Sequence, residues 1–306
     1  MNPICDLHAH CTFSDGTLTP GELIRLAEER NIAALALCDH NTVAGLPDFL
    51  KAAENSPVEA IPGTEFSTEY RGTELHILGL FIEPDRYAPV TALLADLLSR
   101  KERSNRQLVE NLKTAGIELD YDAIKASTPR GQVNRALIAA EMVRLGCCGS
   151  IQEAFSQWLS EKRGLYRPPE RLDAFEAIRF IKSIGAVAVL AHPFLNLDEA
   201  GLREFLRQAV PRGLDAMEVY YPKFTPVQTL LATRIAAEFG LLPSGGSDFH
   251  GANKPDIQLG TGRNNLRIGT DILLRLRQRK DDWTLSSVNM PEKTTEKAGI
   301  FLKNKK

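Results

Sequence analysis

The stretch Asp6-Leu7-His8-Ala9-His10-Cys11-Thr12-Phe13-Ser14-Asp15-Gly16 follows a short apolar run and carries two histidines and an aspartate. If residues 3–7 form a strand, His8 and His10 leave its end on the same side, because side chains along a strand alternate. Two such imidazoles can bind one metal ion, and Asp15, after a short turn, can reach a neighbouring ion. An isolated His-x-His pair is more often a chance feature of a strand end. Whether this pair binds metal therefore depends on where the other histidines of the chain lie.

The chain contains six histidines, and each lies at or near the end of an apolar, strand-like run. Most of them also have a carboxylate, glycine or proline close by. Imidazole and carboxylate groups bind the same divalent ions, so this distribution predicts a multinuclear metal site assembled from strand ends. The six are His8, His10, His40, His76, His192 and His250.

The composition is that of an ordinary soluble enzyme. Of 306 residues 43% are hydrophobic, so the chain can bury a large core, and the net charge of −2 gives no global attraction to nucleic acid or membrane. We expect no stable nucleic-acid complex. No apolar run of about 18 residues and no signal-peptide pattern is present. Five cysteines without a Cys-x-x-Cys spacing predict a reducing, cytoplasmic location.

Strand-like and helix-like segments alternate, which predicts an α/β fold, either a barrel or a doubly wound sheet. In a closed barrel, ligands from successive strand ends converge at one face, and this favours the barrel. The predicted strands are 4–7, 32–37, 58–62, 74–80, 186–191, 215–221 and a last one beginning at 241. The predicted helices are 19–31, 43–54, 174–184, 202–209 and 226–239.

Residues 87–167 break this alternation because they contain no convincing strand. Helices are predicted over 89–115, 134–145 and 150–159, and we interpret the segment as a helical insertion, a lid over the barrel mouth. A basic run from Arg100 to Arg106 is either a solvated helix face or a phosphate clamp. The predicted domains are therefore 1–86 and 168–275 for the barrel, 87–167 for the lid, and 276–306 for a loose polar tail.

The segment Gly245-Gly246-Ser247-Asp248-Phe249-His250 repeats the i, i+2 geometry of the first motif. Its paired glycines would let the backbone pack tightly against the site. Two further residues are candidate metal ligands only because the other motifs are present. Taken alone, Glu65 would be a solvated carboxylate and His76 a core residue. Asp39, beside His40, could orient that imidazole from behind.

These ordered motifs resemble the polymerase-and-histidinol-phosphatase (PHP) family over about 1–85 and 165–265. Within the family, the helical insertion and the strings Ala-Val-Leu-Ala-His-Pro and Gly-Gly-Ser-Asp-Phe-His-Gly look like the 3′,5′-nucleoside bisphosphate phosphatases, a branch that overlaps with small 5′→3′ exoribonucleases. The resemblance implies a distorted (β/α)7 barrel with three divalent ions. Manganese is expected, with zinc, iron(II) or magnesium as alternatives.

The resemblance also assigns ligands by position. His8, His10, Glu65 and Asp248 would hold one ion; Glu65 would bridge to a second held by His76 and His192; Asp15, His40 and His250 would hold a third. Three positions depart from the family pattern: Cys38 and Asn41 flank the Asp-His pair where Thr and Asp are more usual, and Gln132 stands where the branch often has His.

The implied activity is hydrolysis of the 3′-phosphate of a nucleoside 3′,5′-bisphosphate such as pAp, by a metal-bridging hydroxide. Asp248 or His250 would shuttle the proton to the leaving sugar oxygen. Arginine can donate two bonds to one phosphate, so Arg135 is the first candidate to grip the 5′-phosphate. Its helpers would be Arg130, Asn134 or Lys223, with Ser67 and Tyr221 as weaker candidates.

Other readings stay open. The same scaffold could serve a histidinol-phosphate phosphatase or a 5′→3′ exoribonuclease acting on short 5′-phosphorylated RNA. A non-catalytic sensor of metal or nucleotide is the alternative outside catalysis, although degenerate sites lose ligands and none is missing here. An amidohydrolase is disfavoured, because no lysine stands at the strand end that Glu65 occupies.

Overall fold

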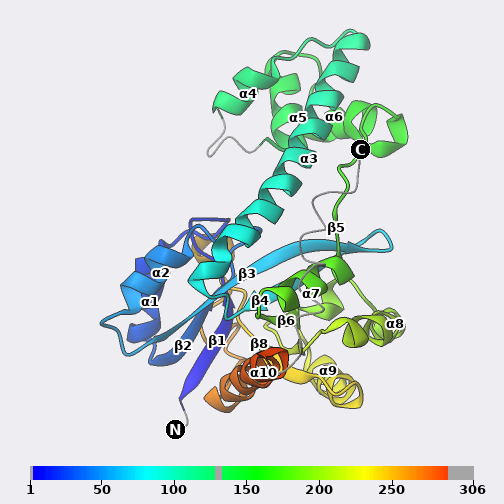
Figure 1. Ribbon diagram of the computed structural model, residues 1–306. Helices are drawn as coiled ribbons and strands as arrows, with labels where there is room; N and C mark the ends of the chain where they lie inside the picture. The colour runs from blue at the N-terminus through cyan, green and yellow to red at the C-terminus, as the bar shows by residue number, and fades with distance from the viewer. Residues whose placement is uncertain (1–2, 128–132, 289–306) are drawn as a thin grey trace. The chain divides into compact units, whose positions relative to one another are not determined.

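The computed structural model describes residues 3–127 and 133–288, the side chains of 283–288 excepted. The predicted α/β class is confirmed (Figure 1). The strands are β1 (Ile4–Ala9), β2 (Ile32–Leu37), β3 (Glu59–Tyr70), β4 (Thr73–Leu80), β5 (Leu172–Asp173), β6 (Val187–Leu190), β7 (Ala216–Tyr220) and β8 (Leu242–Gly245). The helices are α1 (Pro20–Glu29), α2 (Leu46–Ala53), α3 (Tyr87–Thr114), α4 (Tyr121–Ser127), α5 (Arg135–Arg144), α6 (Ile151–Ala154), α7 (Ala174–Ser183), α8 (Glu199–Ala209), α9 (Pro226–Glu238) and α10 (Thr270–Val288).

The main sheet has the order β1-β2-β3-β4-β6-β7-β8, with β5 paired to β3. β4 is antiparallel to both of its neighbours, and the other pairings along this path are parallel. Backbone bonds from Asp248 N to His8 O (2.8 Å) and from His10 N to Phe249 O (2.9 Å) join the segment after β8 to β1. The two ends of the strand order therefore meet beside the first motif.

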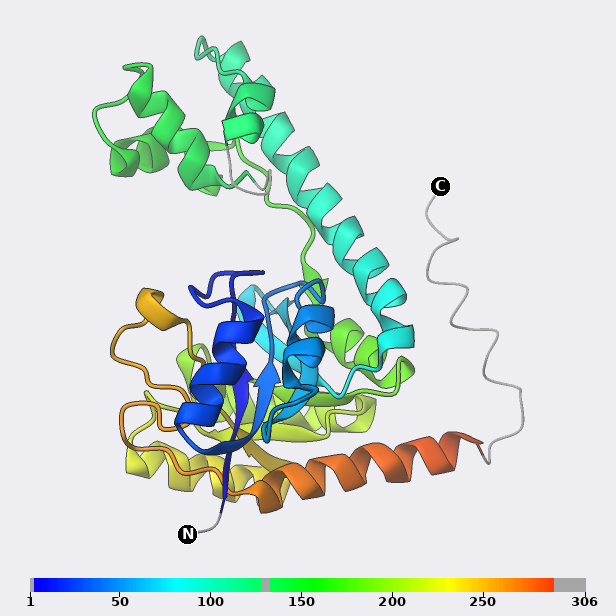
Figure 2. The same cartoon turned by 90° about the vertical axis from the view of Figure 1, so that its left-hand side faces the viewer.

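Helices cover the sheet on the outside (Figure 2). α1 and α2 pack on β2 and β3, α7 on β3, β4 and β6, and α9 on β7 and β8. The strand β2 is apolar along its whole length and almost wholly buried, as expected for a strand with layers on both faces. This packing holds the polar ends of the strands in a rigid frame.

The start of α1 shows why the chain turns into a helix directly after the first motif. The Thr19 side chain accepts a bond from Glu22 N, the Glu22 carboxylate accepts one from Thr19 N at 2.7 Å, and Pro20 occupies the first turn. This is a capping box, which satisfies amides that no helical carbonyl can reach.

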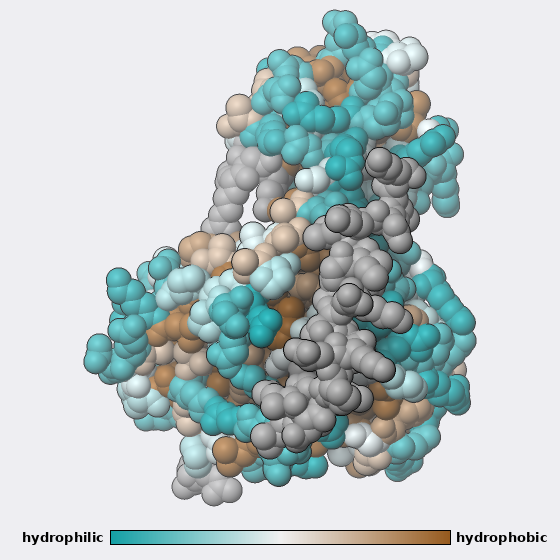
Figure 3. Space-filling model, in the orientation of Figure 1, coloured by the Kyte–Doolittle hydropathy of each residue, from teal (hydrophilic) through white to brown (hydrophobic). Residues whose placement is uncertain are grey.

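Two compact units are present, one formed by Met1–Thr91 with Leu172–Lys306 as far as these are described, the other by Ala92–Arg171. The second unit is helical and has its own buried core, which includes Leu108, Ile138 and Met142. Its visible face is largely hydrophilic (Figure 3). Within the basic run of α3, Arg100 pairs with Asp96 and Glu170, and Arg106 with Glu102 and Asp122. These pairs favour the solvated-face interpretation over a phosphate clamp.

The prediction of a loose tail from residue 276 is wrong as far as Val288, because α10 covers that stretch. Its anchor is a short apolar stripe, Ile272, Leu273 and Leu276, buried against the core that β1 and β6 also line. The polar residues that follow this stripe made the helical pattern hard to recognise in the sequence. Residues 289–306 lie outside the described part of the chain.

Candidate metal centre

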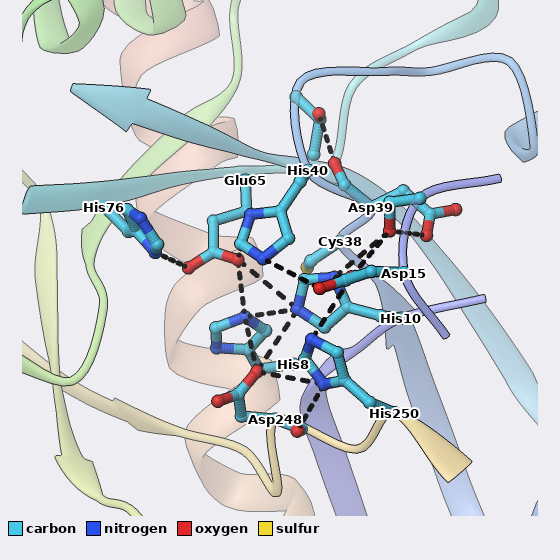
Figure 4. Close-up of polar contacts among 12 residues, drawn as sticks. His8, His10, Asp15, Cys38, Asp39, His40, Glu65, His76, Asp248 and His250 are labelled. Atoms are coloured by element: carbon cyan, nitrogen blue, oxygen red, sulfur yellow. Dashed lines mark hydrogen bonds and ion pairs between the residues drawn. The ribbon is translucent and has the colours of Figure 1, made fainter. Parts of the chain in front are cut away.

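Glu65 is the centre of the site. It lies in the middle of β3 and is fully buried, and five imidazoles contact its carboxylate (Figure 4). Its Oε2 lies 3.3 Å from Nε2 of both His8 and His10, and 3.0 Å from Nδ1 of His40. Its Oε1 lies 2.8 Å from His76 Nδ1 and 3.1 Å from His192 Nε2. The carboxylate of Glu65 on β3 thus gathers imidazoles from β1 and β4 and from the segments after β1, β2 and β6.

A second group gathers around Asp15, which lies in the turn after β1. His250 Nε2 is 3.2 Å from its Oδ1, and His40 Nε2 is 3.9 Å from its Oδ2. His10 Nδ1 lies 3.8 Å from the same Oδ1. The carbonyl of Asp248 accepts the Nδ1–H of His250 at 2.8 Å, so Nε2 is the ring nitrogen of His250 that faces Asp15.

Asp248 has two carboxylate oxygens with different surroundings. Its Oδ1 faces the imidazoles, 3.3 Å from His10 Nε2 and 3.5 Å from His250 Nδ1. Its Oδ2 accepts bonds from the Tyr221 hydroxyl (2.8 Å) and the Lys254 ammonium (2.6 Å). Because two donors already use the lone pairs of Oδ2, only Oδ1 is directed at the cluster.

All predicted ligand positions therefore meet in one cluster. His76 approaches from mid-strand, because β4 runs antiparallel to its neighbours. Two ligand positions, His192 (φ 27°) and Asp248 (φ 54°), have left-handed backbone conformations, which are costly for non-glycine residues and often found at functional sites.

Gly246 explains how the segment after β8 comes so close to β1. A Cβ at this position would lie 2.5 Å from His8 N, so any side chain would push the two strands apart. The predicted tight packing of the paired glycines is confirmed at this position.

The electrostatics keep the carboxylates charged. Burial alone would raise the pKa of Glu65, but the neighbouring His8 and His76 hold it well below its usual range. Burial would likewise raise the pKa of Asp248. The hydrogen bond from His10 and the charge of His8 outweigh burial and hold this pKa well below its usual range. Burial lowers the pKa of His40 to about 4, so this imidazole is neutral at physiological pH and can donate a lone pair to a cation.

The residues present fit divalent metal ions. Among the described residues three groups bring ligand atoms within 4.8 Å of one another: His10-Asp15-His40-His250, His8-His10-Glu65 and His40-Glu65-His76. Glu65 Oε2 and His40 Nδ1 are buried without a hydrogen-bond partner, although they lie 3.0 Å apart. Unpartnered buried polar atoms are costly, and a shared cation would satisfy both of them.

Glu218 and Lys254 were missed in the sequence. Glu218 is fully buried in β7, where its Oε1 accepts from His8 Nδ1 at 2.9 Å and its Oε2 from His192 N at 2.7 Å. A glutamate within the otherwise apolar run of 216–220 was the available signal. Lys254, four residues after His250, gave no comparable signal, because a lysine in a loop is usually solvated.

Asp39 does not orient His40 as the sequence suggested. Its buried carboxylate instead accepts bonds from Cys11 N (2.9 Å) and Ser14 Oγ (2.5 Å). It therefore fixes the turn that carries Asp15 toward the cluster.

The predicted substrate contacts are distributed over both units. In the unit that contains the sheet, Tyr221 reaches Asp248, Ser67 Oγ accepts from Asn41 Nδ2 at 2.9 Å, and Lys223 is exposed. In the helical unit, Asn134 caps α5, and the Arg135 guanidinium stacks 4.1 Å over the Tyr166 ring and donates to Leu159 O at 3.2 Å. Arg130 and Gln132 lie outside the described residues.

None of the described helices is long and apolar enough to cross a membrane.

Comparisons with known proteins agree with this geometry. The PHP domain family matches residues 6–163. The chain is 35% identical to a 5′-3′ exoribonuclease of Haemophilus influenzae over 80% of its own length and 89% of the relative. It is 30% identical to a 3′,5′-nucleoside bisphosphate phosphatase of Chromobacterium violaceum over 80% and 86% of the two chains. A solved structure from Bifidobacterium adolescentis, described as a metal-dependent phosphoesterase, superposes with a TM-score of 0.66 at 28% identity and covers 91% of this chain and 98% of its own.

The match to the family model spans about half of the chain, and the relative from H. influenzae aligns with 80% of it. The chain therefore belongs to the PHP family and is an enzyme of the metal-dependent phosphoesterase class.

Proposed function

We propose that this enzyme hydrolyses the 3′-phosphate of nucleoside 3′,5′-bisphosphates such as pAp, and releases a 5′-nucleotide and phosphate. The observation that carries the proposal is the cluster of six imidazoles and three carboxylates around Glu65 and Asp15. Such donors suit two or three neighbouring divalent ions. The relative from C. violaceum that carries this activity in its name supports the choice of substrate.

We assign the ligands as the family resemblance does. His8, His10, Glu65 and Asp248 would hold one ion, Glu65 with His76 and His192 a second, and Asp15, His40 and His250 a third. Divalent ions bound there would supply Lewis acidity toward the phosphoryl oxygens and lower the pKa of water at neutral pH. Manganese is the expected ion.

The chain's own residues would orient the ester and provide the proton that the leaving sugar oxygen needs. Asp248 Oδ2 holds the Tyr221 hydroxyl and the Lys254 ammonium, so two proton-bearing groups lie beside the ligand Oδ1. Asp248 or His250 would pass the proton to the leaving oxygen, and the lowered pKa of Asp248 keeps its carboxylate ionised beside these two donors. Lys254 is 30% exposed at its side chain, and its remaining N–H groups can reach a bound anion.

The 5′-phosphate would be gripped away from the ions. The candidates remain those that the family resemblance implies, Arg135 first, with Asn134, Lys223 and Ser67. Arg135 is suited to this task because its stacking on Tyr166 leaves the edge of the guanidinium plane able to donate in pairs.

A second candidate function is 5′→3′ exoribonuclease action on short 5′-phosphorylated RNA, which the relative from H. influenzae favours. Both activities act on a nucleotide that carries a 5′-phosphate. Both break the bond between the 3′ oxygen of that nucleotide and phosphorus. The bisphosphate is therefore the smallest substrate of the same bond cleavage.

The test is phosphate and nucleotide release, with Mn²⁺, from adenosine 3′,5′-bisphosphate, 5′-AMP, histidinol phosphate and a short 5′-phosphorylated RNA. Fast release from the bisphosphate with 5′-AMP resistant is the expected result. Stepwise mononucleotide release from the RNA at equal or greater efficiency would establish the second candidate instead. Hydrolysis of histidinol phosphate alone would refute both.

A further inference from the structure

Glu218 is a buried carboxylate whose two oxygens both accept hydrogen bonds from metal-ligand residues. It is completely inaccessible in β7, and among the described residues it pairs with no lysine or arginine. A buried carboxylate is costly unless it is hydrogen-bonded at both oxygens. Here the two donors are the His8 ring at 2.9 Å and the His192 amide at 2.7 Å.

The bond to His8 settles which ring nitrogen faces the cluster. A carboxylate oxygen can only accept, so Nδ1 of His8 must carry the hydrogen that it donates to Glu218. The other nitrogen, Nε2, lies 3.3 Å from Glu65 Oε2 and is the one that could supply a lone pair to a bound cation. A carboxylate behind a histidine in this way fixes the ring orientation and raises its basicity as a ligand.

The bond to His192 acts on the backbone. His192 follows β6 with φ 27°, a conformation that a non-glycine residue keeps only when its surroundings enforce it. Its amide is held by Glu218 Oε2, and Pro193 follows directly. The same contact therefore aims the His192 ring so that Nε2 lies 3.1 Å from Glu65 Oε1.

We propose that Glu218 is a positioning residue that holds one ligand of each of two neighbouring metal ions, through the ring of His8 and the backbone of His192. The inference rests on the proposed metal-dependent function but not on the identity of the substrate. It follows that a change at Glu218 alters two metal positions together and leaves the Asp15 group in place.

The variant Glu218→Gln tests this by chemistry rather than by size. An amide offers one acceptor and one donor, whereas both partners of Glu218 donate, so glutamine can satisfy only one of them. We expect Mn²⁺ or Zn²⁺ affinity at two positions to weaken by about 10- to 100-fold, as for other residues that orient metal ligands. Isothermal titration and metal content after gel filtration would show one tightly held ion in place of three.

Asp215→Asn is the matched control. Asp215 is also a buried acid beside β7, and it accepts from Ala188 N at 3.0 Å and Lys182 Nζ at 2.8 Å, but it touches no residue of the cluster. The Asp215→Asn variant should have a lower free energy of unfolding, by the same amount with and without metal, and should still bind three ions. Unchanged metal affinity in a folded Glu218→Gln variant, or equal metal loss in both variants, would overturn the proposal.

A measurement on the unmodified protein covers the case in which Glu218→Gln does not fold. Nitrogen-15 spectra of the histidine rings in the Zn²⁺-loaded protein should show His8 protonated at Nδ1 and metal-bound at Nε2. Metal bound at Nδ1 of His8 would refute the inference. If the protein binds three ions but hydrolyses none of the four test esters, the proposed substrate fails and the role of Glu218 stands.

Discussion

If the chain binds the three ions proposed above, replacing Glu65 by glutamine should remove two of them and leave the third. Two of the three donor groups in the described structure contain Glu65, and the group formed by His10, Asp15, His40 and His250 does not. An amide cannot supply the negative charge that two cations share, and its NH₂ would face imidazole lone pairs. Asp15→Asn should have the complementary effect and remove the third ion only.

The size of the effect follows from linkage. An ion present at 100 times its dissociation constant stabilises the folded state by about 2.7 kcal/mol, so three independent ions give about 8 kcal/mol. The Glu65→Gln variant should keep about one third of that increment. Phosphate release should fall by about three orders of magnitude or more, because the two ions that Glu65 would hold supply the Lewis acidity that ester hydrolysis needs.

The assay combines metal content per chain after gel filtration with urea unfolding in chelator and in excess Mn²⁺. Glu69→Gln is the control, because Glu69 lies on the same strand and in none of the three donor groups. Three ions retained in folded Glu65→Gln, or a stabilisation by Mn²⁺ equal to that of the unmodified enzyme, would refute the assignment of Glu65 as the shared ligand.

Three further changes test other parts of the structure. Gly246→Ala should cost about 1–3 kcal/mol in urea unfolding because its Cβ meets the His8 backbone, and stability equal to the parent would contradict this packing argument. Arg135→Met should raise KM for the bisphosphate at least about tenfold, as loss of a charged hydrogen bond does, and should leave KM for p-nitrophenyl phosphate unchanged. Arg144→Met on the same helix is the control. Equal effects on both esters would refute the assignment of Arg135. Thr19→Ala should cost about 1 kcal/mol of stability through the lost cap of α1 and leave kcat unchanged; no loss would show that the capping box does not stabilise the helix.

Periodicity predicted most helices and strands of the fold because their burial is simple. The apolar run of β2 and the capping box of α1 are local patterns with local causes. The stretch after residue 276 was misjudged because the stripe of Ile272, Leu273 and Leu276 is short and becomes meaningful only against the core it covers. Long-range packing of this kind is absent from local sequence.

For the site, the residues of the motifs were predictable, but their supporting partners were not. The structure brings the predicted histidines together with Glu65, Asp15 and Asp248. Glu218 on β7 reaches His8 on β1, and their proximity depends on the closure between β1 and the segment after β8. Lys254 meets Asp248 through the fold of the loop that follows β8, which has no periodic pattern. The role of Asp39 was misassigned for the same reason, since its partners Cys11 and Ser14 are distant in sequence.

The backbone bonds between β1 and Asp248–Phe249 also bear on how the enzyme matures during synthesis. The first ligands leave the ribosome at residue 8, but their partners emerge only after residue 248, whereas the helical unit can fold from contacts within its own 80-residue stretch. Contacts of such long sequence separation form late and slowly. A nascent chain therefore cannot complete the cluster until Asp248 and His250 have been made, and one that stops before Asp248 lacks two of its donors.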